Sequence, residues 1–309
     1  MFAIVYERIS VYKTKSQKDQ GNAVNDRSLL TRVEELHSII EDADLRIVDC
    51  RFDLMQPEAG RAGFLQEHIP GAVYADLDKD LAAPIGPGTG RHPLPDVAEL
   101  AATFGRLGIS NSTQVVVYDD FSGAVAARGW WLLRWLGHKR VSVLEGGIKR
   151  WQELGLPLQG GDVNVVSQLF DPAPRQELVI ETEDIVAAGE SCGQLRLVDA
   201  RDKARFIGES EPIDTVAGHI PGALNLPFST TLNDDGTWKS IEELRGLWGG
   251  VLGEGDKGPW SVMCGSGVTA CHLAISGQLV GLPEPRLYVG SWSEWIRDPA
   301  RAVATGRTE

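Results

Sequence analysis

The chain has 309 residues, which suits two domains of ordinary size, and its hydrophobic content of 42% excludes global disorder. Its 43 acidic residues outnumber the 30 basic ones, which gives a net charge of -13. An acidic surface repels phosphate backbones and anionic lipids, so we expect neither nucleic acid nor a membrane as a partner.

Residues 1–27 start with a short apolar stretch and continue with charged side chains. They lack the basic start, apolar centre and small-residue cleavage site of a signal peptide, and no apolar run in the chain approaches roughly 18 residues. We therefore predict an N-terminal extension on a cytoplasmic protein. Four cysteines in 309 residues are too few for a disulfide framework, and because they include no C-x-x-C pair, we expect no structural zinc site. We expect no other metal and no cofactor.

The first predicted domain covers residues 28–158. It has an apolar strand in Leu45–Arg51, an H-I-P-G-A loop at His68–Ala72, a β-branched strand at Gln114–Tyr118 and a helix from Ala124 to Leu136. Continuous apolar strands that alternate with helices are typical of a parallel sheet covered on both faces. The pattern therefore predicts an α/β domain.

The second half of the chain repeats the first. Glycines and prolines interrupt residues 159–177, which we predict to be a linker, and a second domain follows at residues 178–305. The L-R-x-V-D-x-R motif recurs at Leu195–Arg201 and the H-I-P-G-A motif at His219–Ala223, at offsets of 150 and 151 residues. A glycine followed five residues later by tryptophan recurs as well. The sequence therefore predicts two copies of one domain.

Cys264 comes directly after a predicted strand, Pro259–Met263, and before a predicted helix, Val268–Val280. In open α/β domains, sites form beyond the carboxyl ends of the strands. Gly265 and Gly267 allow successive N–H groups to turn inward around the sulfur, and the helix adds its positive end. This environment favours a thiolate and also a persulfide anion. The alternative, a small buried hydrophobic cysteine, explains neither the glycines nor the position.

Two other cysteine chemistries fit this loop poorly. A cysteine-dependent phosphatase needs an arginine six residues after the cysteine, and that position is Ala270. A Cys–His hydrolase needs a histidine against the sulfur, but we expect His272 to point away from it at the surface. The apolar spacing of the helix predicts one face that packs on the sheet. That face consists of Val268, Cys271, Ile275 and Leu279.

The first copy has no thiol at the matching position. When Ser122-Gly123 is aligned with Ser266-Gly267, the residues Tyr118–Phe121 (YDDF) stand where the cysteine should be. The first domain is therefore expected to be structural or to lend side chains to a cleft between the domains.

These motifs together resemble the two-domain sulfurtransferases of the rhodanese superfamily, over nearly the whole chain after about residue 28. Members that prefer thiosulfate typically carry C-R-K-G-V-T in the cysteine loop. Members with C-G-S-G-V-T resemble 3-mercaptopyruvate sulfurtransferases, and the loop Cys264–Thr269 has that sequence. A loop without cations also suits a divalent thiosulfate poorly. Thiosulfate:cyanide sulfurtransferase activity and a non-catalytic persulfide carrier are the alternatives.

The resemblance implies a mechanism. Cys264 would attack the sulfur of 3-mercaptopyruvate, pyruvate would leave, and a thioredoxin-like protein, a small thiol or cyanide would accept the outer sulfur. Ser266, His92 and Asp78 would form a relay in which the aspartate orients the histidine and the histidine moves a proton through the serine. The expected substrate-binding residues are Arg205, for the donor carboxylate, and Gly265, Gly267, Val268 and Thr269, whose N–H groups would hold the persulfide.

One departure concerns a second arginine that the family uses just before G-H-I-P-G. The segment Glu211–Ala217 (EPIDTVA) contains no arginine, and Arg91 beside His92 is a candidate replacement. Arg201 is expected to pair with Asp199 for structural reasons, because the first copy repeats the same V-D-x-R motif.

Overall fold

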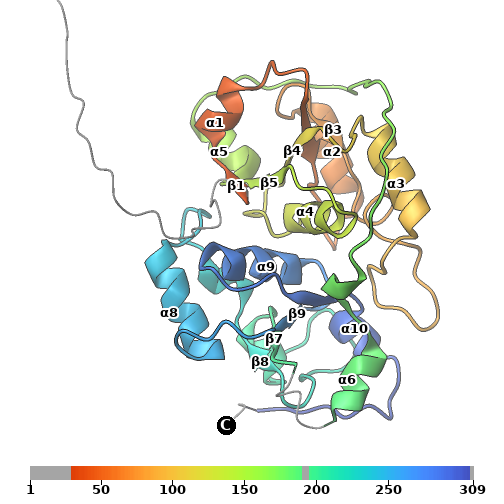
Figure 1. The fold of residues 1–309 in the computed structure, drawn as a ribbon, viewed down its shortest axis with the longest axis vertical. Helices are drawn as coiled ribbons and strands as arrows, with labels where there is room; N and C mark the ends of the chain where they lie inside the picture. Colours follow the sequence, from red (N-terminus) through yellow and green to blue (C-terminus); the bar gives the residue numbers. More distant parts are fainter. Residues whose placement is uncertain (1–28, 190–194, 307–309) are drawn as a thin grey trace, which may run out of the picture.

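The structure is a computed structural model that describes residues 29–189 and 195–306 (Figure 1). The predicted N-terminal extension, residues 1–27, lies outside the described residues. The first domain contains β1 (Leu30–Thr31), α1 (Val33–Ser38), β2 (Leu45–Asp49), α2 (Glu58–Gln66), β3 (Val73–Tyr74), α3 (Val97–Arg106), β4 (Gln114–Tyr118), α4 (Ala126–Trp135), β5 (Val141–Leu144) and α5 (Gly147–Glu153).

The second domain repeats this order. It contains β6 (Val179–Ile180), α6 (Thr182–Ala188), β7 (Leu197–Asp199), α7 (Lys203–Phe206), β8 (Leu224–Asn225), α8 (Ile241–Leu252), β9 (Ser261–Met263), α9 (Thr269–Leu279), β10 (Arg286–Tyr288) and α10 (Ser291–Trp295). Two short 3-10 helices, Gln176–Leu178 and Phe228–Thr231, precede β6 and α8.

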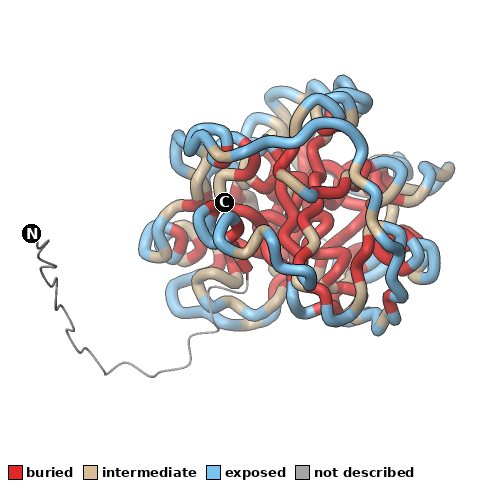
Figure 2. The backbone as a smooth tube through the Cα atoms, turned by 90° about the horizontal axis from the view of Figure 1, so that it is seen from above, coloured by how far each residue is buried: buried red, intermediate tan, exposed pale blue. Residues whose placement is uncertain are grey.

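Each domain is built on a five-stranded sheet. The strand orders are β1-β5-β4-β2-β3 and β6-β10-β9-β7-β8, and the paired strands are parallel. The central strands are buried because they consist largely of apolar residues, and Figure 2 shows the buried residues concentrated in the interior of the molecule. The predicted tandem α/β fold is confirmed.

The repeated motifs hold the same places in both sheets. Arg51 forms a two-pronged ion pair with Asp49 at the end of β2, and Arg201 does the same with Asp199 at the end of β7; the Nη2–Oδ2 distance is 2.7 Å in both. All four side chains are buried or nearly so. A buried, bidentate ion pair fixes the direction in which the chain leaves the strand. The expected structural role of the Arg201–Asp199 pair agrees with this geometry.

The two domains meet through α4 and α9, which pack against each other at the centre of the molecule (Figure 1). Because α4 covers the side of α9 that faces away from its sheet, α9 is buried on all sides from Ala270 to Gly277. The expectation of one packing face and an exposed His272 was wrong. His272 is fully buried, its Nε2 lies 2.9 Å from Thr231 Oγ1, and its ring stacks on Trp238.

The segment predicted as a linker, residues 159–177, follows the surface of the first domain. Gln159 pairs with His68 in an isolated bridge, and the N–H groups of Gln168 and Ala173 bond to the carbonyls of Gly105 and Leu136, both at 2.9 Å. The chain therefore reaches the second domain along a path fixed by backbone hydrogen bonds.

Candidate functional site

Cys264 follows β9 directly, and the start of α10 holds it in place. Its N–H donates to Ser291 Oγ at 3.1 Å, and its carbonyl accepts from the N–H of Trp292 at 3.0 Å. The Ser293 N–H then donates to the carbonyl of Gly265 at 2.9 Å. Cys264 is 2% exposed and lines a cavity of about 270 Å³.

Both domains form this cavity. The second domain contributes Cys264, Gly265, Ser266, Val268, Thr269 and Arg205, together with neighbouring residues. The first domain contributes Phe52, Leu54, Leu77, Arg91, His92, Phe121 and Val125. The first domain therefore lends side chains to a cleft between the domains, which was one of its two expected roles.

The two glycines of the cysteine loop serve different purposes. Gly267 has φ +73°, and a Cβ there would lie 2.5 Å from the carbonyl oxygen of Val289. Gly265 needs no left-handed backbone, but a Cβ there would lie 2.8 Å from Nη2 of Arg91. Gly267 thus permits the turn, whereas Gly265 permits the approach of a cation.

Ser266, His92 and Asp78 come together in a row across the domain boundary. Ser266 Oγ lies 2.8 Å from His92 Nδ1, and His92 Nε2 lies 3.2 Å from Asp78 Oδ1. Burial, followed by the charges of Arg128 and Arg91, lowers the pKa of His92 to about 3, so the ring is neutral at ordinary pH. If the Nε2 proton points to Asp78, Nδ1 is free to accept the hydroxyl proton of Ser266.

Arg205 lies in the cavity, but it is paired with two carboxylates. Its Nε lies 2.9 Å from Glu211 Oε1, and its Nη2 lies 3.0 Å from Asp214 Oδ2, while Arg91 forms an ion pair with Asp214 as well. Burial raises the pKa of Asp214, and both arginines oppose that rise. Sequence reasoning noted the E-P-I-D segment only for its missing arginine and did not see that its acids bind these cations.

Arg128 on α4 is a buried cation that sequence reasoning also missed. It is 0% exposed, and its guanidinium donates to the carbonyls of Gly267 at 3.2 Å and His92 at 3.2 Å. Burial lowers the pKa of Arg128, and the thiols of Cys271 and Cys264 oppose this effect. Arg128 therefore ties the cysteine loop to the histidine loop and places positive charge beneath both.

The first domain shows what this type of loop binds. Asp119 matches Cys264, because the Ile148 N–H bonds to the Asp119 carbonyl as the Trp292 N–H bonds to that of Cys264, both at 3.0 Å. The Asp119 carboxylate accepts four backbone N–H groups at 2.8 Å, from Phe121, Gly123, Val125 and Ala126. The loop of the first domain is therefore an anion-binding nest filled by a carboxylate, and the corresponding loop of the second domain carries the thiol of Cys264.

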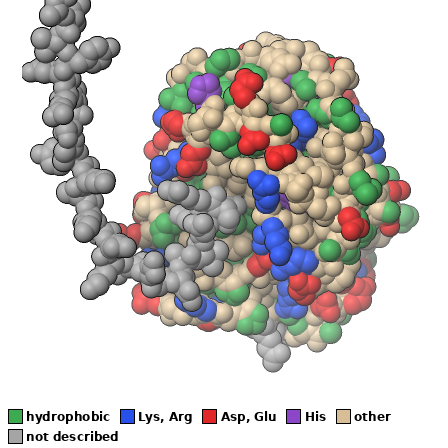
Figure 3. All heavy atoms as spheres, turned by 45° about the horizontal axis from the view of Figure 1, so that its top comes forward, with side chains coloured by type: hydrophobic (Ala, Val, Ile, Leu, Met, Phe, Trp, Pro, Cys, Tyr) green, Lys and Arg blue, Asp and Glu red, His purple; other side chains and the backbone are tan. Residues whose placement is uncertain are grey.

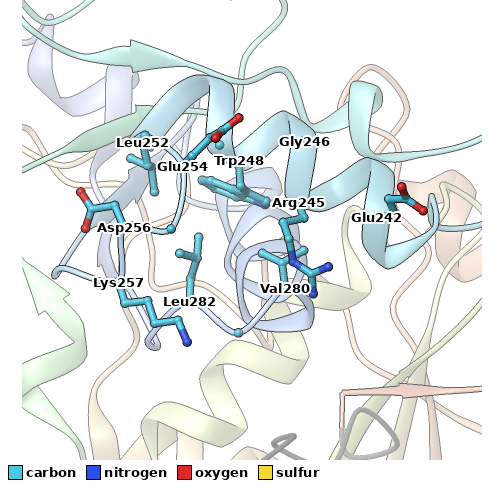
Figure 4. A pocket seen from close by; sticks show the side chains of 14 residues that line it. Glu242, Arg245, Gly246, Trp248, Leu252, Glu254, Asp256, Lys257, Val280 and Leu282 are labelled. Carbon is cyan, nitrogen blue, oxygen red and sulfur yellow. The ribbon is translucent and has the colours of Figure 1, made fainter.

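A second cavity has a lining of different chemistry. Figure 4 shows a cavity of about 440 Å³ between α8, the turn that follows it and the end of α9, whose lining includes Trp248, Arg245 and Lys257 but no cysteine or histidine. In residues 29–189 and 195–306, no group of three or more His, Cys, Asp and Glu side chains is arranged to hold a metal ion.

The distribution of surface charge and the length of the helices are relevant to possible binding partners. Acidic and basic side chains are interspersed over the face shown in Figure 3. Within the described part of the chain, every helix is too short or too polar to span a lipid bilayer.

The chain is similar to named sulfurtransferases along most of its length. A Pseudomonas aeruginosa protein named a probable 3-mercaptopyruvate sulfurtransferase is 46% identical over 90% of this chain and 98% of its own length. Human 3-mercaptopyruvate sulfurtransferase is 37% identical over 85% and 89%, and bovine thiosulfate sulfurtransferase is 36% identical over the same shares.

A solved structure agrees with these sequence matches. The 3-mercaptopyruvate sulfurtransferase from Leishmania major superposes with a TM-score of 0.78 and 31% identity, over 88% of this chain and 76% of that one. The rhodanese-like domain model matches residues 32–154 and again residues 182–298. The chain therefore belongs to the rhodanese family and carries two rhodanese-like domains.

Proposed function

We propose that this protein transfers sulfur from 3-mercaptopyruvate to an acceptor thiol or to cyanide, through a persulfide on Cys264. The observation that carries the proposal is the row of Ser266, His92 and Asp78: Ser266 and His92 are hydrogen-bonded in the lining of the cavity that contains Cys264, and Asp78 contacts the far side of the His92 ring. The names of the relatives from Pseudomonas aeruginosa and Homo sapiens support the choice of donor.

In the first step, the Cys264 thiolate attacks the sulfur of the donor. The new S–S bond forms as the carbon–sulfur bond breaks, and the bonding electrons leave with the three-carbon fragment as the enolate of pyruvate. The enolate takes up one proton at carbon, and the persulfide S–H gives one up. Ser266 is suited to carry this proton, because neutral His92 accepts a hydrogen bond from the Ser266 hydroxyl and Asp78 orients the imidazole ring of His92.

In the second step, an acceptor thiolate attacks the outer sulfur, and Cys264 leaves as a thiolate. The N–H groups of residues 265–269, in the loop that corresponds to the Asp119 nest, stabilise the anion at both stages. The cavity of about 270 Å³ admits a small donor, whereas a thioredoxin-like acceptor has to present its thiol at the opening. A free reactive thiol and thiol acceptors suit the reducing cytoplasm.

The test is the mass of the intact protein after incubation with 3-mercaptopyruvate. We expect a gain of one sulfur atom and release of one pyruvate, with both lost in Cys264→Ser. The matched control is Cys50→Ala, because Cys50 is a buried cysteine of the first domain, outside the cavity lining, and should leave the gain intact. No gain in the wild type, or a gain that persists in Cys264→Ser, contradicts the proposal.

Thiosulfate is the second candidate donor, because bovine thiosulfate sulfurtransferase is nearly as similar as the human mercaptopyruvate enzyme. The two donors are separated by comparing kcat/KM. A preference for thiosulfate would replace the donor but keep the persulfide. A persulfide that is never passed to a small thiol would instead favour a carrier.

A further inference from the structure

Arg205 is the arginine that the family resemblance already assigns to the donor carboxylate; we propose that Arg91 of the first domain is its second partner in binding that carboxylate, and that Asp214 holds the two guanidinium groups side by side. The inference rests on the proposed function, because it identifies the residues that bind the donor. It places one cation of the donor site in each domain and gives Asp214 a positioning role.

Both guanidinium groups lie against the residue that follows Cys264. A Cβ on Gly265 would lie 2.8 Å from Nη2 of Arg91, and 3.6 and 3.8 Å from Nη2 and Nη1 of Arg205. Arg91 and Arg205 also line the cavity that contains Cys264. A carboxylate bound by both would therefore lie within a few bonds of the sulfur that Cys264 attacks.

The hydrogen bonds leave suitable donors open. Asp214 accepts from Nη1 of Arg91 with one oxygen and from Nη2 of Arg205 with the other, and Glu211 accepts from Nε of Arg205. Within the described residues, Nη2 of Arg91 and Nη1 of Arg205 have no hydrogen-bond acceptor, and the buried Nε of Arg91 also has none. Two N–H groups from adjacent guanidinium groups match the two oxygens of a carboxylate.

Asp214 lies behind the two cations and outside the donor space. Its side chain is 4% exposed, against 20% for Arg91 and 14% for Arg205, and it is absent from the cavity lining. Two guanidinium groups at one loop repel each other, and a carboxylate between them offsets that repulsion. Asp214 therefore holds the two guanidinium groups together and leaves their outer N–H groups available for the donor carboxylate.

The backbone fixes the position of Arg91 relative to Cys264. The Arg91 N–H donates to Ser293 Oγ at 3.0 Å, and the Gly90 N–H donates to Glu294 at 3.3 Å. Both acceptors belong to α10, whose first residues also hold Cys264 and Gly265. One short helix thus sets the distance between the reacting sulfur of one domain and the cation of the other.

The charge of this cluster bears on donor choice. Arg91 and Arg205 carry two positive charges, and Glu211 and Asp214 carry two negative charges, so these four side chains are close to neutral before a donor binds, and Arg128 adds one positive charge beneath the loop. A neutral cluster with directed N–H groups suits a monocarboxylate better than a divalent anion, which needs a net positive site. The same residues therefore favour 3-mercaptopyruvate over thiosulfate.

The experiment measures pyruvate binding to the full-length Cys264→Ser chain by calorimetry, with pyruvate as the probe. Adding Arg91→Ala should weaken binding by about 10- to 150-fold, the loss expected for a hydrogen bond to a charged group. The pyruvate affinity of Arg91→Lys should lie between those of the parent and Arg91→Ala, because lysine restores the charge but not the paired N–H groups of a guanidinium. The matched control, Arg150→Ala, removes an exposed arginine that pairs with Glu153 on α5 and should change nothing.

Asp214→Asn, in the Cys264→Ser background, tests whether Asp214 positions the two arginines. Weaker pyruvate binding at an unchanged melting temperature supports this positioning role, and in the active enzyme KM for 3-mercaptopyruvate should rise more than kcat falls. Tighter pyruvate binding would mean that Asp214 competes with the donor, and would overturn the positioning role.

The two proposals fail separately. If Arg91→Ala binds pyruvate like its parent while the wild type turns over 3-mercaptopyruvate, the inference falls and the proposed function stands. If the wild type gains no sulfur from 3-mercaptopyruvate, the proposed function falls first.

Discussion

The Asp119 nest offers the most direct test of the idea that this loop binds anions. Asp119→Ala removes the acceptor of four backbone N–H groups in the first domain, three of them buried and one part-buried. A buried donor left without a partner costs about 1–3 kcal/mol. Since water can enter the vacated space, we take the lower figure for each of the four. The free energy of unfolding should then fall by about 4 kcal/mol.

Asp119→Asn should also destabilise, although it keeps the shape of the side chain. Its amide oxygen can still accept from two of the N–H groups, but its NH2 group would face the other two, donor against donor. A residue that acted through packing alone would tolerate this change. Asparagine therefore separates electrostatic from steric effects at this position.

The assay is urea denaturation, with hydrogen exchange locating the loss of protection in β4 and α4. The matched control is Asp120→Ala, because Asp120 is the exposed neighbour of Asp119 and should change stability by no more than about 0.5 kcal/mol. A loss below about 1 kcal/mol in Asp119→Ala, or an equal loss in Asp120→Ala, would refute the reasoning.

Three further predictions concern the relay and its surroundings. The free energy of unfolding should fall as pH drops below about 6.5, because burial holds the pKa of His92 and of His272 at about 3 while the unfolded chain takes up protons. Each histidine contributes up to about 1.4 kcal/mol per pH unit to this loss. The free energy of unfolding of His272→Gln, measured by denaturation at pH 5 and 7, should therefore change less with pH than that of the wild type. Ser266→Ala should lower kcat with 3-mercaptopyruvate by about 10²–10⁴-fold, and lower it less with thiosulfate, whose sulfite leaves without a proton; equal losses would argue against the relay. Arg128→Met should lower kcat at least about tenfold, because Arg128 bonds the carbonyls of Gly267 and His92, and a full-rate variant would contradict that link.

The sequence predicted the sheets well because their strands are continuous apolar runs. Gln114–Tyr118 was predicted to the residue, whereas the predicted strand Pro259–Met263 begins only at Ser261. Proline lacks the N–H that ladder pairing needs, which explains part of this difference. The family and its two domains followed from repeated motifs, which are local in sequence.

The wrong prediction for His272 and the missed residues Arg128 and Asp214 share another cause, which is contact between segments that are distant in the sequence. His272 and Arg128 are polar residues on helices, where local periodicity assigns them to solvent. Arg128 is buried where α4 meets the cysteine loop and α9, and His272 is buried against Thr231, Phe228 and Trp238. Asp214 belongs to no motif, and only the fold brings it to Arg91, 123 residues away. Ser266, His92 and Asp78 were named from the family pattern, and their catalytic roles stay predictions that the measurements above address.

The division of the cavity between two domains has a consequence for the order of synthesis. His92, Asp78 and Arg91 leave the ribosome in a domain that can fold before Cys264 is made. The cysteine therefore enters a site whose other half is already built. A chain stopped before α9, or one whose domains have not docked, has no complete site, so the appearance of activity marks the end of assembly.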